Sequence, residues 1–163
     1  MKIEEKKEIR LVSDEIISDF IESLSDYEKI KENYKKIKLV LKEIQSNYDE
    51  IILDSSISKS SSNAIEINTK KMNHLMEVMK TNSDRFYINI KTIKEYIKTI
   101  ELCNEKFLRN TLNNPIDSKY LLSLYDSLLP ISKDHKKNSK ELFINSETYL
   151  KDFTEYLKNS KED

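Results

Sequence analysis

Apolar residues recur at seven-residue intervals through most of the chain, a pattern typical of long helices that pack side by side. Residues 64–112 carry one unbroken series: Ile65, Met72, Met79, Phe86, Ile93, Ile100 and Phe107. Residues 3–53 carry two series that alternate by three and four positions. One is mainly aliphatic (Ile9, Ile16, Ser23, Ile30, Ile37, Ile44, Ile51), and the other is mainly aromatic (Phe20, Tyr27, Tyr34, Leu41, Tyr48). Residues 115–159 carry Leu121, Leu128, His135, Leu142, Tyr149 and Tyr156, with Leu124 and Ile131 in a second row. The pattern predicts three helices.

Polar connectors separate these periodic segments. Residues 54–62 are rich in serine and predict a loop, after which Asn63 is expected to cap the second helix. Asn114 and Pro115 favour the start of the third helix, because proline at the first helical position lacks only an N–H that would be unpaired anyway. We therefore expect helices at 3–53, 64–112 and 115–159. Pro130 interrupts the last segment, yet the heptad register agrees on both sides, so we expect one helix kinked there.

Short connectors make consecutive helices antiparallel. The predicted fold is therefore all-α: a single domain over residues 1–163, built as an elongated antiparallel three-helix bundle in up-down-up order with coiled-coil-like heptad packing.

Composition removes several classes of function. The chain contains no glycine, although average usage predicts roughly eleven, so phosphate-binding loops and nucleophile elbows are not present. Cys103 is the single cysteine, which excludes an intramolecular disulfide framework. The first residues lack the apolar core of a secretory signal, and no run is long enough to span a membrane. We expect a cytoplasmic protein, while export without a signal sequence stays open.

Polar residues interrupt the heptad pattern at a common level of the three predicted helices. In an antiparallel bundle, residues of the first and second helices lie level when their numbers sum to about 117, and the sum is about 227 for the second and third. By this rule one layer contains Tyr34, Asn82, Ser83, Asn145 and Ser146. We favour a hydrogen-bonded layer that fixes register over a small ligand pocket. An Asn82→Leu variant separates the two, because only a pocket would lose ligand binding.

Charge is distributed unevenly along the first helix. Residues 14–28 are acidic without a basic residue, and we expect lysines of the other two helices to neutralise part of that charge: Lys91, Lys94 and Lys98 of the second, and Lys133, Lys136 and Lys137 of the third. Residues 29–42 are rich in lysine, and we predict that they form a partner-binding surface of six residues: Lys29, Lys31, Lys35, Lys36, Lys38 and Lys42. Nucleic acid is an alternative partner for this stretch. A net charge of −1 and only three arginines argue against it.

No motif predicts catalysis, a cofactor or a metal. His135 falls on the apolar seam without a neighbouring carboxylate, and His74 with Glu77 forms only a lone His-x-x-Glu, whereas di-iron bundles need such motifs on two helices. We therefore expect a non-enzymatic protein–protein interaction module: an adaptor, assembly factor, inhibitor or secretion partner. Its partner would be a second copy or another helical or acidic protein. Nucleic-acid binding is the first alternative, and an enzyme or ligand binder that uses the polar layer is the second.

Overall fold

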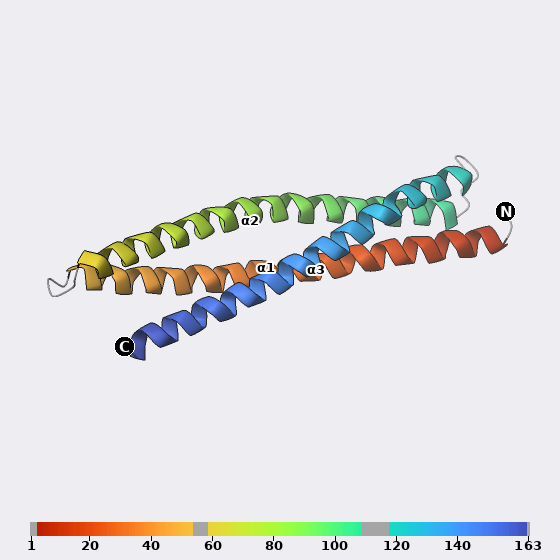
Figure 1. Ribbon diagram of the computed structural model, residues 1–163. Helices are drawn as coiled ribbons and strands as arrows, with labels where there is room; N and C mark the ends of the chain where they lie inside the picture. The colour runs from red at the N-terminus through yellow and green to blue at the C-terminus, as the bar shows by residue number, and fades with distance from the viewer. Residues whose placement is uncertain (1–2, 54–58, 109–117, 163) are drawn as a thin grey trace. The chain divides into compact units, whose positions relative to one another are not determined.

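The computed structural model describes residues 3–53, 59–108 and 118–162, and all of them are helical. Helix α1 spans Ile3–Leu53, α2 spans Lys59–Leu108 and α3 spans Ser118–Glu162 (Figure 1). The described ranges contain no strand, so the all-α prediction and the number of three helices are confirmed. Helices of this length form because the chain has no glycine and only two prolines to interrupt the backbone hydrogen bonds.

The predicted start of the second helix needs correction. Helix α2 begins at Lys59, so Asn63 lies inside the helix, and the prediction that it forms the N-terminal cap is wrong. Serine is only mildly unfavourable in a helix, so a serine-rich segment next to a long helix can extend it. The predicted cap at Asn114 and the start at Pro115 lie outside the described residues. Helix α3 contains Pro130 within an uninterrupted span, which confirms one helix instead of two.

The chain forms two compact units. Unit 1 comprises Met1–Glu28 and Tyr87–Leu142, and unit 2 comprises Lys29–Phe86 and Phe143–Asp163. Each of the three helices contributes residues to both units. The prediction of a single domain over residues 1–163 stays a prediction.

The core of unit 1 combines apolar side chains with satisfied polar groups. The Phe20 ring stacks on Tyr96 with ring centroids 5.5 Å apart. The buried Tyr125 hydroxyl donates a hydrogen bond to the Asn104 side-chain oxygen at 2.6 Å, and the Asn104 amide donates to the Ser13 hydroxyl at 2.9 Å. This chain of bonds joins α3, α2 and α1. Because buried polar groups are costly when unpaired, it fixes the three helices of unit 1 in one register.

The core of unit 2 is more apolar. Its buried cluster consists of Ile37, Leu41, Ile44, Met72 and Leu157. Half-buried side chains from all three helices pack against that cluster: Tyr34, Val40, Met76, Met79, Leu150 and Phe153. Burial of aliphatic and aromatic area is the main stabilising contribution in this unit.

The predicted seams of α1 and α2 are buried where the structure describes their side chains. In α1 both heptad series are buried or half-buried from Ile9 to Ile44. In α2 the series is buried at Met72, Phe86, Ile93, Ile100 and Phe107 and half-buried at Met79.

The predicted seam of α3 is partly wrong. Leu121 and Leu128 are buried as expected, but Tyr149 and Tyr156 are each 43% exposed. The second row lies one position later than the expected Leu124 and Ile131. It consists of Tyr125, Ser132, Ser139, Ser146 and the half-buried Phe153. Serines can occupy a buried row here because polar side chains of α1 meet them, as described below.

Candidate functional site

The six predicted partner-binding lysines all belong to unit 2, but they do not share one surface. Lys31, Lys35 and Lys38 line a cavity between α1 and α2. The Lys29 ammonium lies 5.4 Å from the centre of the Phe143 ring of α3, a cation–π contact. Lys36 and Lys42 are exposed and are not among the residues that line the cavity. The spacing separates Lys29 and Lys36 from the others, because residues 31, 35 and 38 follow one helix face. Lys42 continues that face one turn beyond Lys38, past the lining residues.

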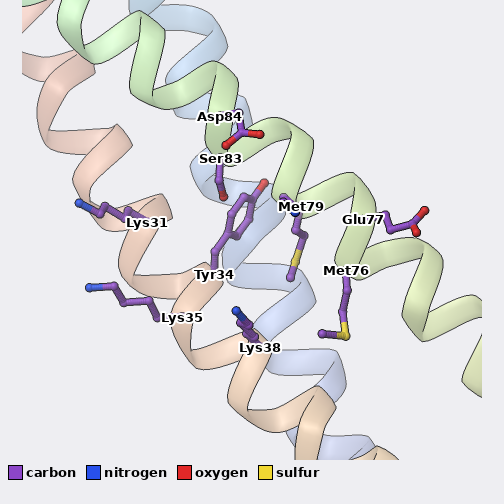
Figure 2. Close-up of a pocket in the computed structure, with 10 residues that line it drawn as sticks. Lys31, Tyr34, Lys35, Lys38, Met76, Glu77, Met79, Ser83 and Asp84 are labelled. Atoms are coloured by element: carbon purple, nitrogen blue, oxygen red, sulfur yellow. The ribbon is translucent and has the colours of Figure 1, made fainter.

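The cavity of unit 2 has a volume of about 470 Å³. Its lining residues are Lys31, Tyr34, Lys35 and Lys38 from α1 and Met76, Glu77, Met79, Lys80, Ser83 and Asp84 from α2. Figure 2 shows Tyr34, Met76 and Met79 between the two helices, with Lys31 and Lys35 projecting from α1. We call this cavity the α1–α2 groove; its floor is apolar and its edges are charged.

Tyr34 shapes the floor of the α1–α2 groove. Its ring lies 5.6 Å from that of Phe86, and its hydroxyl is hydrogen-bonded to the side chain of Asn82. Burial raises the pKa of the Tyr34 hydroxyl above its ordinary value of 10.0, although the bond to Asn82 opposes the rise. The phenol is therefore neutral at physiological pH and acts as a hydrogen-bonding and stacking group.

The two walls of the α1–α2 groove differ in charge. The α1 wall carries only lysines: Lys31, Lys35 and Lys38. The α2 wall alternates, with Glu77, Lys80 and Asp84. Lys35 also lies 3.4 Å from Glu32 one turn away, but both side chains are more than 60% exposed, and such pairs contribute little.

The predicted polar layer is divided between a core contact and the groove. Ser146 is fully buried and accepts a hydrogen bond from the Asn33 amide at 3.0 Å. Tyr34 meets Asn82 as described above, Ser83 lines the groove, and Asn145 is exposed. Asn33, which the sequence analysis did not name, also donates to Glu147 at 2.8 Å. The role of the layer, structural or ligand-binding, stays a prediction.

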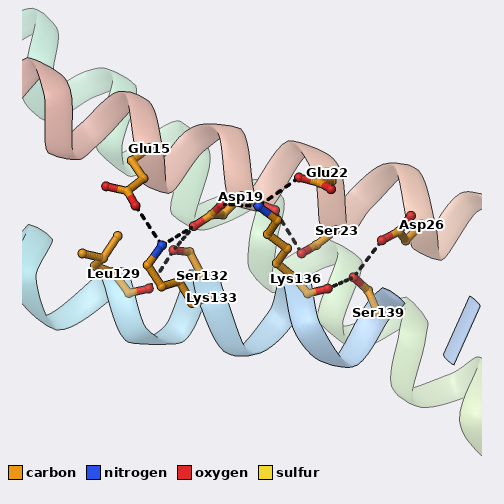
Figure 3. A network of polar contacts seen from close by, with 10 residues as sticks. All are labelled: Glu15, Asp19, Glu22, Ser23, Asp26, Leu129, Ser132, Lys133, Lys136 and Ser139. Carbon is orange, nitrogen blue, oxygen red and sulfur yellow. Dashed lines mark hydrogen bonds and ion pairs between the residues drawn. The ribbon is translucent and has the colours of Figure 1, made fainter. Parts of the chain in front are cut away.

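A ladder of polar pairs joins α1 to α3, and the sequence analysis missed it. In unit 1 the Ser132 hydroxyl donates to Asp19 at 3.4 Å, and the Ser139 hydroxyl donates to Asp26 at 3.3 Å (Figure 3). In unit 2 Asn33 meets Ser146 with the same offset of 113 residues. The signal was present in the sequence as two matched series with seven-residue spacing. The row of buried serines on α3 was not predicted, because a heptad pattern of apolar residues does not include serine.

Lysines of α3 neutralise the acidic part of α1 within unit 1, as expected for Lys133 and Lys136. Lys133 lies 2.8 Å from Glu15 and 3.7 Å from Asp19. Lys136 lies 3.3 Å from both Asp19 and Glu22 (Figure 3). The bond to Glu15 raises the pKa of Lys133, and the bond to Glu22 raises that of Lys136. Asp19 itself is only 4% exposed, so its negative charge is held among partners inside the fold.

His135 belongs to an aromatic cluster of unit 1. Its ring nitrogen Nδ1 lies 3.5 Å from the Tyr27 hydroxyl, and its ring lies 6.1 Å from that of Phe20. Burial lowers the pKa of His135 below 6.5, while the nearby charge of Asp134 opposes the shift. These contacts are those of a packed core residue.

Residues 3–53, 59–108 and 118–162 contain no group of three or more His, Cys, Asp or Glu side chains placed to hold a metal ion. Within the same ranges, no helix is long and apolar enough to cross a membrane.

Comparisons of the chain with protein-family models, with curated proteins and with solved structures find no match. The functional proposal therefore depends on the geometry and chemistry of the α1–α2 groove.

Proposed function

We propose that this chain is a non-catalytic protein–protein interaction module and that the α1–α2 groove of unit 2 is its main contact surface. The groove carries the proposal because it combines an apolar floor with charged edges, the arrangement found at protein interfaces. Its floor is formed by side chains that also pack against the core of unit 2, so the surface is held in place by the fold. A preformed surface lowers the entropy cost of binding.

The finer features of the fold form part of the same proposal. We propose the up-down-up order, coiled-coil-like packing and a bend at Pro130. Within unit 1 the pairs Ser13–Asn104 and Phe20–Tyr96 support the order, because α2 numbers fall as α1 numbers rise. We also propose a cytoplasmic location, which rests on the amino-acid composition alone.

A nucleic-acid partner is the second candidate. The three lysines of the α1 wall supply positive charge for phosphates. The carboxylates of Glu77 and Asp84 on the opposite wall of the groove would repel the phosphates of a nucleic acid. For this reason we favour a protein partner.

Photocrosslinking tests the proposed function. A photoreactive amino acid placed at the exposed Ser83 lies at the groove, and one placed at the exposed Lys98 of unit 1 serves as control. After irradiation in the cells that naturally make the protein, we expect a crosslinked protein from position 83 and none from position 98. That product would be another protein or a second copy of the chain. A crosslink to nucleic acid, or no crosslink from position 83, would contradict the proposal.

A further inference from the structure

The charge pattern of the α1–α2 groove indicates what kind of partner fits it, provided that the proposed interaction function holds. The lysine wall covers residues 31–38 and the alternating wall covers residues 77–84. In each wall the first and last charged residues are therefore seven positions apart, or about 10 Å along the helix. A packed helix also places a side chain of the same heptad position against its neighbour every seven residues. A partner helix could face both walls over two turns.

The floor of the groove suits one large apolar side chain of such a helix. Met76 and Met79 are half-buried and lie beside Tyr34. Methionine is unbranched and flexible, so it adapts to side chains of different shape. Helix-binding grooves hold an amphipathic helix through apolar anchors separated by three, four or seven residues.

The walls determine the charges that the partner helix should carry. Lys31, Lys35 and Lys38 lie on the α1 side of the groove, and acidic residues on the neighbouring edge of a bound helix would complement their charge. Glu77 and Asp84 stand on the opposite wall on either side of Lys80, so a basic residue on the second edge would be attracted there. Because the two edges of the partner helix carry opposite charges, binding in one direction along the groove is favoured over binding in the reversed direction.

The acidic segment of a second copy is a poorer occupant. The carboxylates of Glu15, Asp19 and Glu22 on α1 are paired with lysines of α3 in unit 1. To enter a groove on another copy, these acids would first have to leave their partners. The occupant is therefore better supplied by a different protein.

We propose that the α1–α2 groove binds an amphipathic helix of a partner protein, which places an apolar side chain on the Tyr34, Met76 and Met79 floor, an acidic edge against the α1 lysine wall and a basic residue against the α2 wall.

Designed peptides test this proposal directly. The first peptide is a fluorescent helix of about three heptads with leucine in the apolar stripe, glutamate along one edge and lysine along the other. The second peptide has lysine in place of every glutamate. Titrated with the full chain and followed by fluorescence anisotropy, the first should bind saturably and weaken as salt is added, while the second should not bind. Equal binding of both peptides, or of neither, would overturn the proposal.

Exposed lysines provide matched variants. Lys31→Glu, Lys35→Glu and Lys38→Glu together should weaken binding of the first peptide on the order of tenfold or more, because three rim attractions become repulsions. Lys29→Glu with Lys36→Glu changes charge on another face of the same helix, outside the groove, and should have a much smaller effect. An equal loss in both variants would show that net charge, and not the groove, is responsible.

A steric variant and a DNA probe complete the test. Ser83→Trp should fill the groove and weaken peptide binding while circular dichroism shows an unchanged helix content. Binding of a labelled DNA duplex that is lost with the three lysine reversals would overturn the proposal in favour of nucleic acid. If photocrosslinking from position 83 still captures a protein but the three lysine reversals do not reduce that capture, the proposed function stands and the helix-binding proposal fails.

Discussion

Units 1 and 2 use the same helical packing but treat charge in different ways. In unit 1 the acidic residues of α1 are paired with Lys133 and Lys136 of α3, so the charges hold the fold together. In unit 2 three lysines of α1 line an open groove with an apolar floor. Segments of the same three helices therefore support both arrangements, and the charged residues beside the core are paired within the fold in one unit and line a groove in the other.

The α1–α3 ladder shows how this difference is encoded. In unit 1 Asp19 and Asp26 face Ser132 and Ser139, and each serine is followed in the sequence by a lysine. In unit 2 the corresponding α1 residue is the neutral Asn33, and Glu147 follows Ser146. Asparagine suits this position because its amide donates to both the serine hydroxyl and the glutamate. Where α1 carries an aspartate, a lysine follows the facing serine of α3, and where α1 carries the neutral Asn33, a glutamate follows it.

The largest expected effects come from the two cores. Ile16→Ala in unit 1 and Leu41→Ala in unit 2 each remove a fully buried side chain, and we expect each to lower the free energy of unfolding by about 2–5 kcal/mol. Thermal and urea unfolding of the two variants measure the loss. If the chain is a single domain, both variants shift one common transition. Two separate transitions, each sensitive to only one variant, would contradict the single-domain prediction.

Removal of Asp19 should have the next largest effect. Asp19→Ala removes the buried carboxylate from between Lys133 and Lys136 and removes one acceptor of the Ser132 hydroxyl, which keeps the Leu129 carbonyl oxygen at 2.8 Å. We expect a loss of about 1.5–3 kcal/mol in urea unfolding, because hydrogen bonds to charged groups are the stronger ones. Glu22→Ala is the control, because Glu22 also pairs with Lys136 but its side chain is 48% exposed. Its loss should lie within about 0–1 kcal/mol. Equal losses would show that the ladder contributes no more than an exposed ion pair.

The contact of Asn33 with Ser146 in unit 2 allows a test of whether the charge on α1 must match the charge that follows the serine on α3. Asn33→Asp replaces the amide that donates to Glu147 by a second carboxylate, and we expect a loss of about 1–3 kcal/mol at neutral pH, because an acceptor meets an acceptor. Adding Glu147→Lys should recover much of this loss by recreating the arrangement of Asp19, Ser132 and Lys133. Unchanged stability of Asn33→Asp, or a double variant less stable than the single one, would contradict this match of charge between α1 and α3. Urea unfolding at constant salt provides the comparison.

The smallest expected effect concerns His135. Its pKa is lowered in the folded protein mainly by burial, so the unfolded chain takes up a proton at a higher pH than the folded chain does. The stability that the neutral ring contributes is therefore complete above about pH 6.5 and is lost as the pH falls through the lower folded pKa. His135→Gln should reduce the fall in stability measured by urea unfolding between about pH 7.5 and about pH 5. An identical pH profile for the variant would show that other groups cause the fall.

Heptad spacing was sufficient to predict the parts of the fold that depend on apolar rows. The residues of the two heptad series of α1 from Ile9 to Leu41 are buried or half-buried as expected. The rows of α3 were harder to assign because Ser132, Ser139 and Ser146 are small and polar. Their burial depends on hydrogen-bonding partners of α1 more than 100 residues away, and a pattern search along one helix does not detect such partners.

The candidate site was predictable only in part. The lysine-rich stretch is evident in the sequence, and helical spacing alone separates Lys31, Lys35 and Lys38 from Lys29 and Lys36. Lys42 follows the same helix face as Lys35 but is not among the residues that line the groove. The α1–α2 groove was not predictable in the same way. Its depth depends on how Tyr34 packs against Asn82 and Phe86, which sets the space left beside Met76 and Met79.

The most direct test of the contrast between the units is methionine-methyl NMR on the full chain. The described helices contain three methionines: the groove residues Met76 and Met79 and the core residue Met72. When the first peptide, with glutamate along one edge, is added, the methyl signals of Met76 and Met79 should shift more than that of Met72. The second peptide, with lysine in place of every glutamate, should leave all three signals unchanged. Shifts of equal size at the three methionines, or the same response to both peptides, would contradict a charge-selective groove in unit 2.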